Sequence, residues 1–188
     1  MELDSLYQEV ILDHYKHPKN KALKADPTRQ VKHVNTSCGD EIVLNLHLSD
    51  NHVTDVTWEG IGCSISQAST SVMSELMRDK SIEEALALVD EFQSMIQSKG
   101  AIVGDEEKLG DGVAFAGVSK FPARVKCALL GWMALKDAVV PFTAARVVTP
   151  VTARVPPTVA LPEALIVPVP RDVKPEIVPP VNVTAPAF

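Results

Sequence analysis

The chain has 188 residues, 46% of them hydrophobic, which suits one folded domain with a substantial core. Its 18 Lys and Arg against 24 Asp and Glu give a net charge of −6, which argues against a basic surface for nucleic acid. No apolar run reaches the roughly 18 residues that span a bilayer, and the N-terminus has no signal-peptide pattern. We therefore expect a cytoplasmic protein that engages neither nucleic acid nor membrane.

The composition changes near residue 140. Residues 141–188 hold 11 of the 14 prolines and no glycine. Proline cannot donate to a helix or to a central strand, so this segment is predicted to be a proline-rich, extended or disordered tail. Residues 1–140 are predicted to form the folded domain.

Within 1–140 the apolar pattern alternates between helical and strand periods. A first helix ends at Pro18, and strands are predicted over 31–36, 42–49 and 52–58. A helix begins at about Ser64, and a Ser81-x-x-Glu84 capping box starts another that runs to about 97. Residues 98–121 are expected to be an irregular insertion, before a last helix over about 122–138. The order predicts an α+β fold: a small antiparallel sheet of about three strands packed with helices.

The three cysteines argue against a disulfide framework, because their number is odd and they are widely spaced. Cys38 stands two residues before Asp40, with a glycine between them that allows a tight turn. Cys63 precedes a predicted helix, where free backbone N–H groups favour a thiolate. Cys127 lies on the last helix, one turn after Arg124. Three thiolates and a carboxylate suit tetrahedral zinc. The spacings match no zinc finger, however, so core cysteines and a turn aspartate remain alternatives at this point.

Longer motifs carry more information than these spacings. The segments Tyr7-x-x-Val10-Ile11-x-Asp13-His14-Tyr15 and Gly60-Ile61-Gly62-Cys63-Ser64-Ile65-Ser66, together with Cys38-Gly39-Asp40, resemble the U-type (IscU/NifU N-terminal-like) iron–sulfur cluster assembly family. The ending Phe121-Pro122-x-Arg124-x-Lys126-Cys127 and the glycine-rich insertion resemble its SufU branch, the zinc-dependent sulfurtransferases. The resemblance covers residues 1–140 and implies an IscU/SufU-like fold.

This resemblance implies a function and a set of site residues. Cys38, Asp40, Cys63 and Cys127 would bind one Zn²⁺, and Cys38 would accept persulfide sulfur from a SufS-type cysteine desulfurase after a histidine of that enzyme replaces it on zinc. Arg124 would contact the partner. Downstream iron–sulfur scaffold proteins would be further partners.

Two other functions remain open. The same four side chains suit a [2Fe–2S] cluster or iron, which would make the protein an assembly scaffold. The second alternative is an interaction protein with a structural zinc ion, because closed zinc sites with four protein ligands are structural in many domains. The five histidines are interpreted as structural or solvated, and the two tryptophans as core or edge residues.

Overall fold

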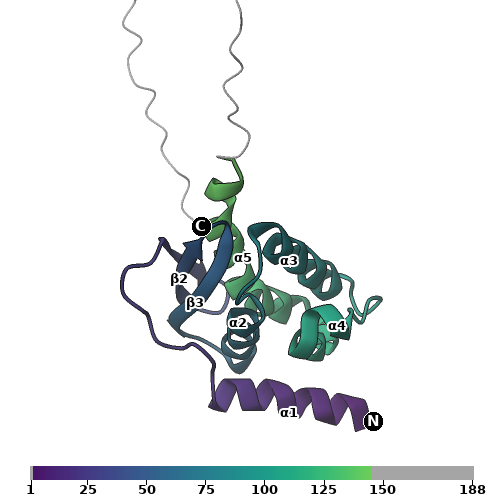
Figure 1. Cartoon of the computed structure of the whole chain (residues 1–188). Coiled ribbons are helices and arrows are strands. Elements are labelled where there is room, and N and C mark those ends of the chain that lie inside the picture. Colours follow the sequence, from purple (N-terminus) through teal and green to yellow (C-terminus); the bar gives the residue numbers. More distant parts are fainter. Residues whose placement is uncertain (1, 145–188) are drawn as a thin grey trace, which may run out of the picture. The chain divides into compact units, whose positions relative to one another are not determined.

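The computed structural model describes residues 2–144 (Figure 1), and the side chains of residues 5–140 within them. The predicted tail therefore lies almost wholly outside the described residues, and its extended or disordered character stays a prediction. In chain order the elements are α1 (Glu2–Lys16), β1 (Arg29–Asn35), β2 (Asp40–Ser49), β3 (His52–Ile61), α2 (Ser64–Leu76), α3 (Ile82–Gln97), α4 (Glu106–Leu109), the 3₁₀ helix η1 (Gly110–Lys120) and α5 (Pro122–Ala144).

The three strands form one antiparallel sheet in the order β1-β2-β3. Strand β2 alternates as predicted, because Ile42, Leu44 and Leu46 point into the core and are at most 1% exposed. The hairpin between β2 and β3 turns at Asp50 and Asn51, both with positive φ, which matches the twist of the flanking strands. The α+β fold predicted from the sequence is confirmed.

The helices bury the inner face of this sheet. Helix α5 packs on β1 and β2 and also contacts α2 and α3, while α2 packs on β3 and carries α1 on its other side. Figure 1 shows α2 and α5 next to the sheet, with α3 and α4 farther from it. In the core, Phe92 stacks on Trp132 with ring centroids 3.9 Å apart, and Phe115 meets Phe92 edge-on. Both tryptophans are fully buried, as predicted.

Hydroxyl groups join α2 to its neighbours. Ser69 donates to the carbonyl oxygen of Ala128 at 2.7 Å and accepts from the Trp132 indole at 3.0 Å, both on α5. Ser71 bonds the ring of His14 on α1 at 2.8 Å. These serines are fully buried and hydrogen-bonded, so they hold α2 against two helices without leaving a polar group unpaired. The α2–α5 contact brings two cysteine-bearing segments together, because Cys63 caps the N-terminus of α2 and Cys127 lies on α5.

The structure corrects the prediction for one segment and for the end of one helix. Residues 98–121 are not an irregular insertion, because α4 and η1 occupy most of them. In η1, Gly112, Phe115 and Val118 recur at the three-residue spacing of a 3₁₀ helix and all face the core. Helix α5 continues to Ala144, beyond its predicted end near residue 138. Within residues 2–144, no helix combines the length and apolarity that crossing a membrane requires.

Candidate functional site

The turn between β1 and β2 positions two of the predicted site residues. The carbonyl oxygen of Asn35 accepts from the backbone N–H groups of Cys38 at 3.2 Å and Gly39 at 2.8 Å. Gly39 has a φ of 75°, which favours glycine and lets the chain reverse within four residues. As a result Cys38 is exposed at the tip, whereas Asp40, the first residue of β2, is buried beneath it.

Cys63 is joined to Asp40 at the N-terminus of α2. The backbone N–H of Cys63 donates to Asp40 Oδ1 at 3.0 Å, and Cys63 Sγ lies 3.5 Å from Asp40 Oδ2. Gly62 makes this approach possible, since a Cβ there would lie 2.9 Å from Asp40 Cγ and 2.6 Å from Ser66 Oγ. The carboxylate therefore satisfies an orphan donor of the helix and at the same time faces the thiol.

Cys127 closes the group from the α5 side. It is fully buried, and its Sγ lies 3.0 Å from Cys38 Sγ. Burial raises the pKa of the Cys127 thiol well above its ordinary value, and the neighbouring Cys38, Asp40 and Cys63 raise that pKa further. In the metal-free chain this thiol is held protonated at neutral pH. A cation would reverse that preference, because a coordinating thiol gives up its proton.

The donor set fits a tetrahedral metal ion. The ligand atoms of Cys38, Asp40 and Cys127 all lie within 4.8 Å of one another, and Cys63 reaches the group through Asp40. With zinc–sulfur bonds of about 2.3 Å and zinc–oxygen bonds of about 2.1 Å, neighbouring ligand atoms of a tetrahedral ion are about 3.6–3.8 Å apart. The 3.5 Å between Cys63 Sγ and Asp40 Oδ2 is close to this value, whereas the two sulfurs of Cys38 and Cys127 are nearer to each other. The structure thus groups three of the predicted ligands, Cys38, Asp40 and Cys127, and places the fourth, Cys63, against Asp40.

Asn35 also belongs to the site, and sequence reasoning missed it. Its side-chain amide donates to Cys38 Sγ at 3.0 Å and to Cys127 Sγ at 3.6 Å. The signal that could have found it is the Asn-x-Ser spacing at the end of a strand, which is typical of an Asx turn. Lys126, the residue before Cys127, is exposed and reaches Ser37 Oγ at 3.5 Å.

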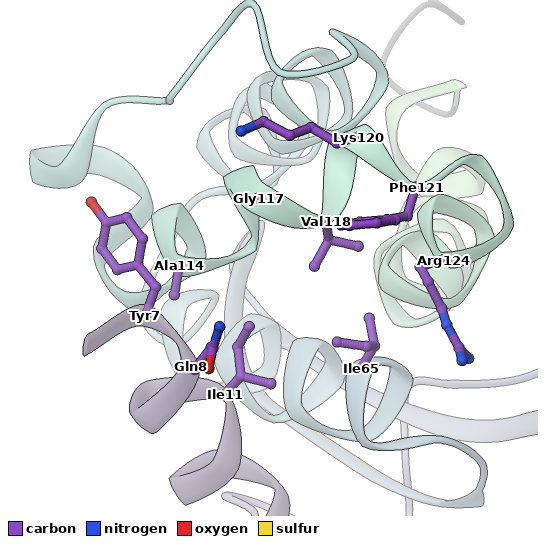
Figure 2. Close-up of a pocket in the computed structure, with 10 residues that line it drawn as sticks. All are labelled: Tyr7, Gln8, Ile11, Ile65, Ala114, Gly117, Val118, Lys120, Phe121 and Arg124. Carbon is purple, nitrogen blue, oxygen red and sulfur yellow. The ribbon is translucent and has the colours of Figure 1, made fainter. Parts of the chain in front are cut away.

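Arg124 lies at the edge of a groove rather than among the cysteines. The groove has a volume of about 520 Å³. Figure 2 shows it between α1, the start of α2, η1 and the start of α5, with Ile11, Ile65 and Val118 around the hollow and the Arg124 side chain beside it. Lys120 is the other cation of the lining, and none of the described residues that line the groove is acidic. The side chain of Arg124 is exposed, which leaves it accessible to a partner.

Comparison with known proteins identifies the family. The NifU-like N terminal domain pattern matches residues 6–128. The chain is 47% identical to the zinc-dependent sulfurtransferase SufU of Bacillus subtilis, over 73% of this chain and 91% of the relative. It is 41% identical to the iron–sulfur cluster assembly scaffold protein IscU of Streptococcus pyogenes, over 73% of this chain and 85% of the relative.

A solved structure gives the same result for the fold. It is described as an iron–sulfur cluster assembly scaffold protein for the SUF system of Fervidobacterium islandicum AW-1. That protein is 36% identical to the chain and superposes with a TM-score of 0.66 over 72% of this chain and 97% of the other. The resemblance to SufU-type proteins seen in the sequence motifs is confirmed. The chain belongs to the NifU-like N-terminal domain family, whose U-type members serve iron–sulfur cluster assembly.

Proposed function

We propose that this iron–sulfur cluster assembly protein is a zinc-dependent sulfur carrier. Cys38, Asp40, Cys63 and Cys127 hold one Zn²⁺, and Cys38 accepts sulfur from the persulfide of a cysteine desulfurase. The difference in exposure among the ligands carries this proposal. Cys38 is exposed, whereas Asp40 is 2% exposed and Cys127 is fully buried. A partner from outside can therefore reach Cys38, while the buried ligands retain the ion.

The chemistry asked of Cys38 is a thiol exchange. Bound zinc would hold the thiols deprotonated and contribute no redox chemistry. The Cys38 thiolate attacks the outer sulfur of the partner's persulfide, so that a new sulfur–sulfur bond forms at Cys38. The partner's own sulfur–sulfur bond breaks, and its cysteine leaves as a thiolate. The number of sulfur–sulfur bonds and the overall oxidation level of the sulfurs are unchanged, so no oxidant or reductant is needed.

The groove beside Arg124 is the proposed docking surface for the desulfurase. It joins an apolar lining to two cations, Lys120 and Arg124, so it suits a protein surface that offers an apolar and an acidic side chain. Ile65 and Arg124 in its lining stand two residues after Cys63 and three before Cys127, which places the docked partner beside the thiols. Docking of the desulfurase and transfer of its sulfur would thus occur on adjoining surfaces.

The test of the carrier function begins with the full chain purified anaerobically without added metal. We expect about one zinc per chain from the ligand count and geometry, with neither iron nor acid-labile sulfide. Incubation with a cysteine desulfurase and cysteine should then place a persulfide on Cys38, detected by alkylation and mass spectrometry. Cys38→Ala should abolish it. Persulfide on Cys63 or Cys127 would contradict the role of Cys38.

A different metal content would support the alternative function. Iron with matching sulfide would mean that the four side chains assemble a [2Fe–2S] cluster, as suits relatives named scaffold proteins. Zinc with no persulfide on any cysteine would indicate a structural ion.

The docking surface has its own test. We expect Arg124→Ala to weaken binding to the desulfurase by about tenfold, because truncating an anchoring arginine costs one kcal/mol or more at typical interfaces. Zinc content should not change. Lys16→Ala, which removes an exposed cation of α1 outside the groove lining, is the matched control. Equal effects of the two substitutions would show that only net charge matters and would remove the groove from the interface.

A further inference from the structure

Asn35 forms hydrogen bonds to two cysteine sulfurs in addition to those that shape the β1–β2 turn. It is the last residue of β1, it pairs with Asp40 in the sheet register, and it is 7% exposed. Its backbone carbonyl forms the β1–β2 turn as described above. Its side-chain amide is the part that a turn alone does not explain.

The hydrogen bonds of the side chain fix which way the amide faces. Asn35 Oδ1 accepts from the backbone N–H of Ser37 at 3.1 Å, and a backbone N–H can only donate. The oxygen must therefore face Ser37, which directs the NH₂ group towards Cys38 Sγ at 3.0 Å and Cys127 Sγ at 3.6 Å. An amide nitrogen has two N–H donors, which is one for each sulfur.

Cys38 has little else to hold its side chain. Among the residues that the structure describes, Asn35 Nδ2 and Cys127 Sγ are the groups within hydrogen-bonding distance of Cys38 Sγ. Cys127, by contrast, is enclosed by the core. A residue on an exposed turn loses its orientation unless a buried neighbour fixes it. Asn35 is that buried neighbour, and its own place in the sheet makes it rigid.

We propose that Asn35 is a positioning residue that holds the Cys38 sulfur next to Cys127, through hydrogen bonds to both sulfurs. This inference rests on the proposed function, in which Cys38 is both a metal ligand and the sulfur acceptor. Hydrogen bonds from outside the ligand shell orient the ligands, and losing one typically costs about 10–100-fold in metal affinity. Asn35 would act on zinc retention and on the aim of Cys38 during sulfur transfer.

Asn35→Asp separates positioning of the sulfur from shaping of the turn. Aspartate keeps the oxygen that accepts from Ser37, so the turn is preserved, but it removes both donors to sulfur. Asn35→Ala removes both functions. The matched control is Asn45→Asp, because Asn45 is 3% exposed, lies in the same sheet, and its side chain bonds Gln30 and the Lys24 carbonyl, not a cysteine, among the described residues.

The first readout is zinc affinity, measured by competition with a chromophoric chelator. We expect Asn35→Asp and Asn35→Ala each to weaken zinc binding by about tenfold or more, and Asn45→Asp to bind like the unaltered chain. In the cobalt(II)-substituted protein, loss of a hydrogen bond to sulfur should also move the sulfur-to-cobalt charge-transfer band to longer wavelength. A merely structural role would not move that band. Normal zinc affinity in Asn35→Asp, with a loss only in Asn35→Ala, would overturn the inference.

A second readout needs no metal and separates this inference from the proposed function. In the metal-free chain, Cys38→Ala should shift the side-chain amide proton resonances of Asn35 and leave those of Asn45 in place. An unmoved Asn35 amide would overturn the inference even if zinc binds. A shifted amide in a chain that binds no zinc would refute the proposed function and leave the positioning role standing.

Discussion

The tight packing of Gly62 against Asp40 and Ser66 allows a quantitative test of the metal centre. In Gly62→Ala the new Cβ would lie 2.9 Å from Asp40 Cγ and 2.6 Å from Ser66 Oγ. Ser66 Oγ is itself bonded to the Cys63 carbonyl at 3.1 Å, so it is not free to turn away without cost. Carbon atoms pack at about 3.5–4.0 Å, so the Asp40 carboxyl must move by about 0.6 Å.

This displacement is large for a metal ligand and moderate for the fold. Ligand distances in a metal site tolerate about 0.2 Å, so a shift three times larger should weaken zinc binding by about tenfold or more. Overpacking in a tight region costs about 1–3 kcal/mol of unfolding free energy. We therefore expect both a loss of zinc affinity and a lower stability of the metal-free chain.

Two further glycines supply the controls. In Gly131→Ala the new Cβ would lie 2.5 Å from Thr70 Oγ1, between α5 and α2, and the nearest atoms it meets all belong to Thr70 and not to a proposed ligand. It should reduce stability as much as Gly62→Ala does, with unchanged zinc affinity. Gly117→Ala meets nothing within 4 Å and should change neither property.

The assay is chelator competition for zinc together with urea unfolding of the metal-free variants. Equal zinc affinities for Gly62→Ala and Gly131→Ala would refute the reasoning, because the clash at Asp40 would then act only through general stability. Unchanged zinc affinity in both variants would remove Asp40 from the ligand set.

Four other outcomes are expected. Asp40→Ala should loosen zinc without preventing alkylation of the cysteines in the metal-free chain, and full zinc retention against a chelator would contradict its role as ligand. Zinc affinity should rise between pH 6 and 8, by up to about tenfold per pH unit for each proton displaced, because the raised pKa of Cys127 keeps its thiol protonated until the metal takes the proton's place; a flat pH profile would oppose this. Ser81→Ala should lower the unfolding free energy by about 1 kcal/mol, since its hydroxyl and Glu84 form the capping box of α3, and denaturant unfolding measures it. Removing residues 145–188 should leave zinc content unchanged, because all four proposed ligands lie within residues 38–127; a loss of zinc would tie the tail to the site.

Strand and helix positions follow from local patterns, and most were predictable. The alternation of Ile42, Leu44 and Leu46 specifies which face of β2 is buried, whatever the strand packs against. The Ser81–Glu84 capping box starts α3 where it was predicted, because both partners lie within one turn. The four ligands, too, were predicted from short motifs around each cysteine, and their role as ligands stays a prediction.

Other features depend on contacts between distant segments. The sequence predicts neither that the serines of α2 are buried nor that they bond α1 and α5, because hydroxyl groups look solvent-facing until their partners are known. The η1 segment looks irregular in sequence because its glycines weaken helical propensity, and the hydrophobic core of the folded chain overrides that preference.

In the candidate site, too, some features follow from the sequence and others only from tertiary packing. The candidate donors could be proposed from the sequence, because Cys38, Asp40, Cys63 and Cys127 stand in motifs that resemble the family. Their difference in exposure was not readable, because it depends on α5 burying Cys127 while the β1–β2 turn carries Cys38 to the surface. The sequence also did not predict that the Asn35 amide lies between the sulfurs of Cys38 and Cys127, because these cysteines are 89 residues apart in the chain. Composition and periodicity thus determine which groups are available, and only tertiary packing decides which of them a partner can reach.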